Sequence, residues 1–145
     1  MKISKVLGWC SFVFLFVLGG CSQSDFHLVK ELAEKGDADS QLKLGRLYAE
    51  GDVVPEDAAE AVKWYGLAAE QGQSDAQVWL GMAYETGKGV PTDKVEAYAW
   101  FDVASASFKN AEVRRDGVKA LLSGSEVALA ESRATEFSEK YGNGQ

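Results

Sequence analysis

The chain of 145 residues contains one histidine, two cysteines and two prolines. This shortage of histidine and cysteine removes the usual ligands of a zinc site and the usual base of a nucleophilic triad. We expect the single histidine, His27, to be a solvated surface residue. A glycine-rich phosphate loop ending in Gly-Lys-Ser/Thr is also absent from the sequence. These absences argue against an enzyme, and we expect neither a metal nor a cofactor.

Positive charge is scarce as well. The chain has 15 Lys and Arg residues and 22 Asp and Glu residues, which gives a net charge of −7. Removing residues 1–20, with Lys2 and Lys5, leaves 13 basic residues against 22 acidic ones, or −9. Nucleic acid is therefore not an expected partner, because binding to phosphates depends on basic side chains. Electrostatic attraction to anionic lipid headgroups is disfavoured for the same reason.

The only long apolar run, from Val6 to Leu18, follows the basic residues Lys2 and Lys5. At about 13 residues it is shorter than the roughly 20 that a membrane-spanning helix needs, and it is typical of a secretory signal. The next residues, Leu18-Gly19-Gly20-Cys21, resemble a bacterial lipobox. That resemblance implies cleavage before Cys21 and attachment of lipid to its sulfur. An ordinary signal peptide with a chance cysteine, or an uncleaved anchor, is the alternative.

This interpretation divides the chain into a signal peptide (1–20), a lipidated tether (21–25) and one folded domain (26–145). Several acyl chains hold a protein firmly to a bilayer, whereas one chain holds it only marginally. Ser22 resembles the context that sorts such lipoproteins to the outer membrane, so we expect a protein that is anchored there and faces the periplasm. Because Cys10 lies within the signal, no thiol remains for a disulfide.

The folded domain contains an internal repeat. Pro55 and Pro91 lie 36 residues apart in similar surroundings, and residues 39–72 match residues 75–108 at 13 of 34 positions. A fixed period of 20–50 residues is the signature of a repeat architecture. The matched positions include Gln41/Gln77, Leu44/Leu80, Gly45/Gly81, Tyr48/Tyr84, Gly51/Gly87, Asp57/Asp93, Ala61/Ala97 and Trp64/Trp100.

Each repeat is predicted to form two helices. Gly51 and Gly87 fall where the first helix should end, and Asp57 and Asp93 are suited to cap the second. Ser74 with Gln77 resembles a capping box that begins the first helix of the second repeat.

Each first helix also contains an internal glycine, Gly45 or Gly81. Glycine costs a helix about 1 kcal/mol relative to alanine, so a close approach of the partner helix is expected there. We predict that Trp64 or Trp100 lies across this gap. Residues 26–36 resemble the second helix of an incomplete leading repeat, and residues 111–141 are predicted to be two capping helices.

The shared pattern of Leu-Gly, Tyr, Gly, Val-Pro, Asp, Ala and Trp resembles the Sel-one-like repeat of the tetratricopeptide superfamily. Two departures are that Val53 replaces the loop glycine kept at Gly89, and that Phe108 stands where Gly72 predicts glycine. The resemblance implies an all-α solenoid, a right-handed superhelix of helix pairs that scaffolds complexes or holds a protein or peptide on its concave face.

By this resemblance the first helices line the groove. Among the residues that they would present, six are the predicted partner-binding residues: Lys43, Arg46, Glu50, Trp79, Met82 and Glu85. Trp79 is notable because its counterpart is Lys43, so the repeat does not require an aromatic residue there. Tryptophan and arginine are also frequent interface hot spots. The alternative is that Trp79 covers the capping helices.

Ser40 and Lys43 match the Ser-x-x-Lys motif of penicillin-binding enzymes, and some relatives of this repeat family have been linked to β-lactams. The partner motifs Ser-Asp-Asn and Lys-Thr-Gly are absent, and the second repeat has Ala76 and Trp79 instead. We therefore interpret both as ordinary surface residues. A covalent fluorescent penicillin label on Ser40 would reverse this interpretation.

The function expected from these features is a non-catalytic adaptor or scaffold, anchored in the membrane of the cell envelope. The resemblance implies an alternative, an immunity protein that neutralises a secreted toxin, because small lipid-anchored members of this repeat family can neutralise toxins directed at the periplasm. An acidic surface would also attract a basic toxin. A β-lactam-interacting enzyme ranks third.

The replacement Trp79→Ala tests whether this side chain serves binding or the core. We expect helicity and melting temperature to stay close to wild type while partner binding weakens. Circular dichroism measures the first two. A large loss of melting temperature would show that Trp79 belongs to the core.

Overall fold

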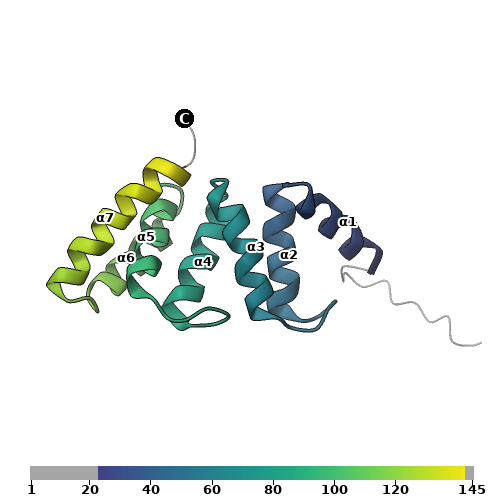
Figure 1. Ribbon diagram of the computed structural model, residues 1–145, viewed down its shortest axis with the longest axis horizontal. Coiled ribbons are helices and arrows are strands. Elements are labelled where there is room, and N and C mark those ends of the chain that lie inside the picture. The colour runs from purple at the N-terminus through teal and green to yellow at the C-terminus, as the bar shows by residue number, and fades with distance from the viewer. Residues whose placement is uncertain (1–22, 143–145) are drawn as a thin grey trace, which may run out of the picture.

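Residues 23–142 of the computed structural model are described here, and they form seven α-helices and no strand. The helices stand side by side in an extended row (Figure 1). This arrangement confirms the all-α solenoid of helix-pair repeats. The helices are α1 (Gln23–Glu34), α2 (Ala38–Glu50), α3 (Ala58–Glu70), α4 (Ser74–Thr86), α5 (Lys94–Ser105), α6 (Lys109–Lys119) and α7 (Gly124–Tyr141).

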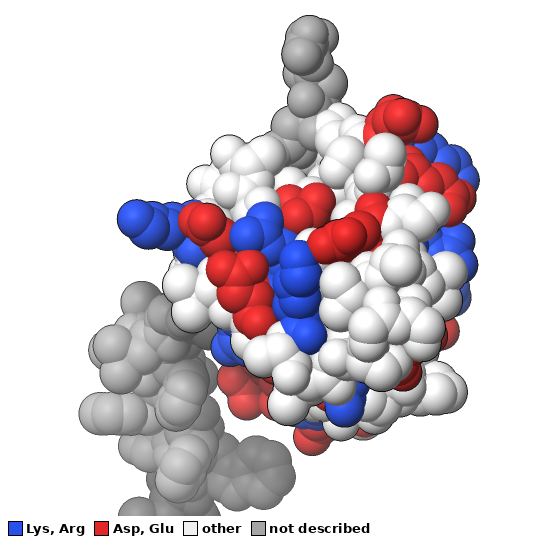
Figure 2. Space-filling model, turned by 90° about the vertical axis from the view of Figure 1, so that its left-hand side faces the viewer, with Lys and Arg blue, Asp and Glu red and all other residues white. Residues whose placement is uncertain are grey.

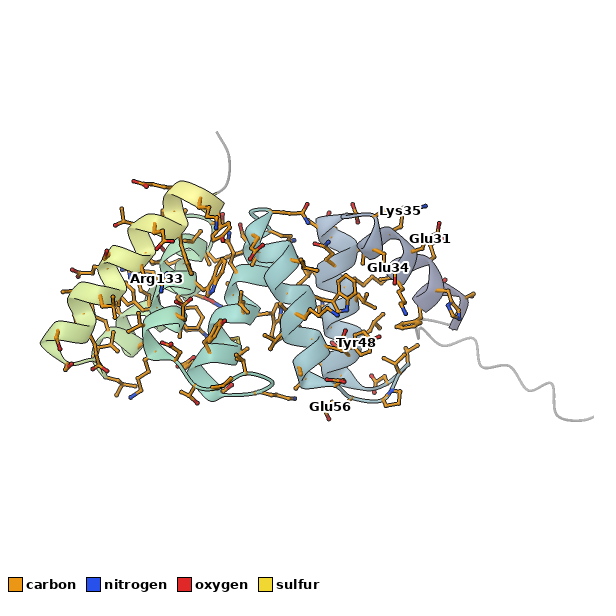
Figure 3. The ribbon with its side chains drawn as sticks, viewed as in Figure 1. Glu31, Glu34, Lys35, Tyr48, Glu56 and Arg133 are labelled. Carbon is orange, nitrogen blue, oxygen red and sulfur yellow. The ribbon has the colours of Figure 1, made fainter. Side chains whose placement is uncertain are left out.

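The two repeats are the pairs α2–α3 and α4–α5, which have the most extensive contacts between neighbouring helices. Helix α1 packs on α2 at one end of the row, and α6 packs on α5 at the other. Helix α7 lies against α5 and also reaches α3. Arg133 points from α7 toward α5 (Figure 3), where its Nε lies 3.0 Å from a Glu96 carboxylate oxygen.

The helix ends follow the predicted turn chemistry. Gly51 and Gly87 both adopt the left-handed conformation, with φ 76°, after α2 and α4. Asp57 and Asp93 cap α3 and α5 by accepting hydrogen bonds from backbone N–H groups of the first turn. The predicted capping box at Ser74 is wrong, because the side-chain oxygen of the preceding residue, Gln73, accepts the capping hydrogen bond from the Ala76 N–H.

The two internal glycines lie at close helix contacts, as predicted, but opposite different side chains. A Cβ placed on Gly45 would lie 2.6 Å from Cε1 of Tyr65, and one on Gly81 would lie 2.8 Å from Cδ1 of Phe101. The prediction that Trp64 or Trp100 lies across the gap is therefore wrong by one residue. Since neighbouring residues on a helix point about 100° apart, the tryptophans face elsewhere.

Each tryptophan instead packs toward an end of the row. Trp64 belongs to a small core shared by α1, α2 and α3, which also contains Phe26 and Leu44. Trp100 lies under α7, with its ring 4.5 Å from that of Phe137 and 5.4 Å from that of Tyr141. The terminal helices therefore cover aromatic surface that a longer array would cover with further repeats.

The first helix begins earlier than the sequence suggested. Helix α1 starts at Gln23, so the segment 23–25, which was predicted to be tether, is helical. Its buried face is formed by Phe26, Val29 and Ala33. None of the helices between residues 23 and 142 is long and apolar enough to cross a membrane. The predicted signal peptide and Cys21 lie outside the described residues.

The close contact predicts opposite effects for two glycine substitutions in the same helix pair. Gly45→Ala should lower the free energy of unfolding by about 1–3 kcal/mol, because the new methyl group would collide with the Tyr65 ring. Gly66→Ala in α3 should raise it by up to about 1 kcal/mol, because no atom beyond the neighbouring backbone lies within 4 Å. Urea unfolding followed by circular dichroism measures both, and equal stabilisation by the two changes would contradict the contact.

Candidate protein-interaction surface

A pocket of about 230 Å³ opens between α2 and α4, with α3 behind it. We call it the α2–α4 pocket. Its lining is mainly apolar and includes four alanines. The lining residues are Arg46, Ala49, Glu50, Ala58, Ala61, Tyr65, Trp79, Met82, Ala83, Thr86 and Lys88.

Four of the six predicted partner-binding residues line this pocket: Arg46, Glu50, Trp79 and Met82. The other two do not. Lys43 lies exposed on α2, and Glu85 forms an ion pair with Arg114 of α6 at 3.1 Å. The structure therefore brings together residues from two successive first helices, as the repeat register predicts, but over a smaller area than the six predicted residues would cover.

Trp79 forms one wall of the pocket. Its ring stacks on that of Tyr65, with centroids 5.9 Å apart and planes inclined by 17°, and the side chain is 39% exposed. The alternative that Trp79 covers the capping helices is wrong, because its stacking partner belongs to α3 and the pocket lies between α2 and α4. A rigid, half-exposed aromatic ring beside a hollow is typical of a binding surface.

Tyr65 was not predicted as a site residue, because its position in the repeat was assigned to the core. It is only 4% exposed, and its hydroxyl has no hydrogen-bond partner among the described residues. Burial raises the pKa of Tyr65 to about 12, with a smaller lowering effect from Arg46 and a raising effect from Glu50. The second repeat has Phe101 at this place, so the hydroxyl is one of the features of the sequence that distinguish the two sites.

The Sel1 repeat family matches residues 38–73 and 74–107, which are the helix pairs α2–α3 and α4–α5, and the pocket lies between the first helices of these pairs. The chain is a Sel1-like repeat protein. Sel1 repeats are protein-interaction modules, and this fold is generally a scaffold rather than an enzyme.

Two solved structures are similar to this Sel1-like repeat protein. A protective antigen present in uropathogenic Escherichia coli strains and displaying an SLR fold superposes with a TM-score of 0.81 at 35% identity, over 86% of this chain and 28% of that one. A Sel1 repeat protein from Oxalobacter formigenes superposes with a TM-score of 0.58 at 28% identity, over 77% of this chain and 98% of that one. The chain thus spans little more than a quarter of the length of the first relative. No curated protein matches.

Charged side chains surround the α2–α4 pocket in pairs. Arg46 and Glu50, both on α2, lie 3.5 Å apart, and Lys88 lies 2.8 Å from Glu56. Figure 3 labels Glu56 in the loop that follows α2. All four side chains are at least half exposed, so each pair contributes at most about 1 kcal/mol to stability. A partner could therefore separate these pairs at little cost.

The gap between the next two first helices, α4 and α6, is the interval equivalent to the one that holds the α2–α4 pocket. In this Sel1-like repeat protein it is bridged by side chains of the protein itself. The Arg114 guanidinium lies 6.0 Å from the centre of the Phe101 ring and also pairs with Glu85. Arg114 of α6 thus joins the Phe101 ring behind this interval to the Glu85 carboxylate of α4, the preceding first helix. In the α2–α4 interval no such bridge is present among the described residues, because Arg46 pairs within its own helix.

The far end of the row is a second exposed surface, formed by α6 and α7. Basic and acidic side chains are interleaved on it beside an uncharged area (Figure 2). Arg115 pairs with Asp102 and Asp116 there, and Lys119 pairs with Glu131.

The residues considered for chemistry lie apart from this pocket. Ser40 is only 8% exposed at the start of α2, so the interpretation of it as a surface residue is wrong, whereas Lys43 is exposed as expected. His27 is exposed, as predicted, beside the ring of Phe26. Between residues 23 and 142 no three His, Cys, Asp or Glu side chains are placed to hold a metal ion.

The burial of Tyr65 predicts a loss of stability in alkali. Its folded-state pKa of about 12 lies above the ordinary value of 10.0, so the unfolded chain loses this proton first. Stability is therefore retained below pH 10 and falls as the pH rises toward 12. Tyr65→Phe should show a smaller loss of melting temperature between pH 9.5 and 11.5 than wild type. Equal losses in the two proteins would show that this tyrosine ionises freely in the folded state.

Proposed function

We propose that this Sel1-like repeat protein is a non-catalytic adaptor of the bacterial cell envelope. In this proposal it binds a partner protein through the concave face of the solenoid, centred on the α2–α4 pocket. A lipid on Cys21 holds it at the outer membrane, facing the periplasm. The observation that carries the proposal is an open apolar pocket, walled by a half-exposed tryptophan, in a fold that serves as a protein-interaction module.

The composition of the pocket supports a protein partner. Trp79 and Arg46 are of the residue types that most often dominate interface energetics, and Met82 adds a flexible apolar surface. The surrounding ion pairs form a polar rim around an apolar centre, which is the usual anatomy of an interface. The charges provide orientation, while burial of the tryptophan would provide much of the binding free energy.

The anchoring part of the proposal rests on the amino-terminal sequence. A short apolar run after two lysines precedes Leu18-Gly19-Gly20-Cys21, and helix α1 begins two residues later at Gln23. Two residues span at most about 7 Å. A lipid on Cys21 would therefore hold the repeats close to the bilayer surface, where the partner would be a membrane protein or a protein assembled at the membrane.

Photo-crosslinking in living cells tests this function. With p-benzoylphenylalanine at Met82, we expect discrete adducts with a partner protein, because the probe replaces a side chain in the pocket wall. The matched control is the same probe at Leu129 of α7, which is also exposed but lies at the far end of the row. Adducts from Leu129 alone, or the same adducts from both positions, would contradict binding at the pocket.

The same cells test the anchor through Cys21→Ala. We expect this change to abolish incorporation of labelled palmitate and to release the protein from the membrane fraction. Retention of label and of membrane association in the variant would contradict lipidation at this cysteine. Because adducts and fractionation are scored separately, the interaction and the anchor are tested independently.

A further inference from the structure

We infer that the α2–α4 pocket receives one large apolar side chain from a basic peptide segment of the partner, and that the Tyr65 hydroxyl donates a hydrogen bond to an acceptor atom of that segment. The inference rests on the proposed function, because it specifies the partner's chemistry at the same surface. Three observations carry it: an unpartnered hydroxyl, a hollow made by small residues, and the charge of the chain.

The hydroxyl of Tyr65 is costly to the folded protein. It is buried, and no described residue accepts or donates a hydrogen bond to it. A buried polar group without a partner costs about 1–3 kcal/mol. The repeat does not need the hydroxyl, because Phe101 packs against Gly81 in the same way that Tyr65 packs against Gly45. Tyr65 is part of the pocket wall, and a hydrogen bond to a bound segment would recover this cost once that segment displaces the side chains that cover the hydroxyl.

The hollow is wider in this repeat because two of the positions around Tyr65 are small here and not in the second repeat. Ala49 and Ala58 line the pocket, whereas their counterparts in the second repeat are Glu85 and Lys94. Glu85 is the residue that Arg114 uses to bridge the next interval. The pocket volume of about 230 Å³ is several times the roughly 30 Å³ that a water molecule occupies. Together with the stacked ring of Trp79, this shape and polarity suit one large apolar side chain.

The charge of the protein favours a basic segment around that side chain. The chain beyond residue 20 has 13 basic and 22 acidic residues, a net charge of −9. Next to the pocket, Arg46 and Lys88 are each already paired with a glutamate, so they offer no surplus positive charge to an acidic peptide. Long-range attraction therefore selects a segment rich in lysine or arginine, while the pocket selects its apolar residue.

Synthetic peptides test the inference directly. The probes are blocked heptapeptides with two lysines at each end, glycine spacers and a central phenylalanine, leucine or alanine. The full chain in phosphatidylcholine nanodiscs is labelled with ¹⁵N, and its Trp79 indole signal is assigned through Trp79→Phe. We expect saturable shifts of this signal with phenylalanine or leucine and none with alanine. Replacing the lysines by glutamates should weaken binding at least tenfold.

Two variants test the roles of the hydroxyl and the hollow. Tyr65→Phe should weaken the phenylalanine peptide roughly two- to tenfold, the range expected for one neutral hydrogen bond, without lowering the melting temperature. Ala49→Glu introduces the side chain of the second repeat and should abolish binding. Leu67→Ala, an exposed change on α3 outside the pocket lining, should leave affinity unchanged.

Unchanged affinity in Tyr65→Phe, equal binding of the alanine peptide, or an unmoved Trp79 signal would overturn the inference. If the peptides fail while adducts from position 82 persist, the partner binds by different chemistry and only this inference fails. If the adducts also disappear, the proposed function fails with it.

Discussion

In both repeats the first helix presents a glycine to an aromatic ring of the second helix, and this contact sets how closely the two helices approach. Gly45 meets Tyr65 and Gly81 meets Phe101, each at a separation that leaves no room for a side-chain carbon. With the ring held against the glycine, the Trp79 ring stacks on Tyr65 in the first repeat and the Arg114 guanidinium lies over Phe101 in the second. The aromatic ring that packs against the glycine within a helix pair therefore also forms the floor of the gap between successive first helices.

What differs between the two intervals is what covers that ring. Between α4 and α6 the guanidinium of Arg114 lies over Phe101 and is held by Glu85. Between α2 and α4 the stacked indole of Trp79 leaves a pocket, and two alanines, Ala49 and Ala58, occupy positions that carry charged side chains in the second repeat. The same repeat architecture thus has a gap between α4 and α6 that is bridged by side chains and a gap between α2 and α4 that is open. The difference comes from a few side chains that the fold does not constrain.

Much of the fold could be predicted from the sequence because its determinants are local. Glycine after a first helix and aspartate before a second act through their own backbone, so the helix ends near Gly51 and Asp57 followed from residue type and period alone. The glycine's aromatic partner was missed by one position. Trp64 and Tyr65 are adjacent and both suited to a core, and the rotation of α3 that chooses between them depends on packing with α1 and α4. Gln73 likewise took the capping role expected of Ser74, which sequence spacing could not decide.

The pocket was predictable in part for the same reason. The repeat register placed Arg46, Glu50, Trp79 and Met82 on one surface, since it specifies which face of the first helices is free. It could not show that Glu85 is bound by Arg114, because that pairing joins elements 29 residues apart and depends on where α6 lies. Tyr65 and the alanines of the second helix were missed because they were assigned to the core. In a solenoid only two helix layers thick, a buried residue of the second layer can also line a pocket of the surface.

The Tyr65 ring lies directly against the α-carbon of Gly45, and a nuclear Overhauser measurement is the most direct test of this contact. We expect strong cross-peaks between the Gly45 α-protons and the Tyr65 ring protons, together with an upfield ring-current shift of those α-protons. Absence of these cross-peaks, with cross-peaks from Gly45 to the indole of Trp64 in their place, would contradict the contact.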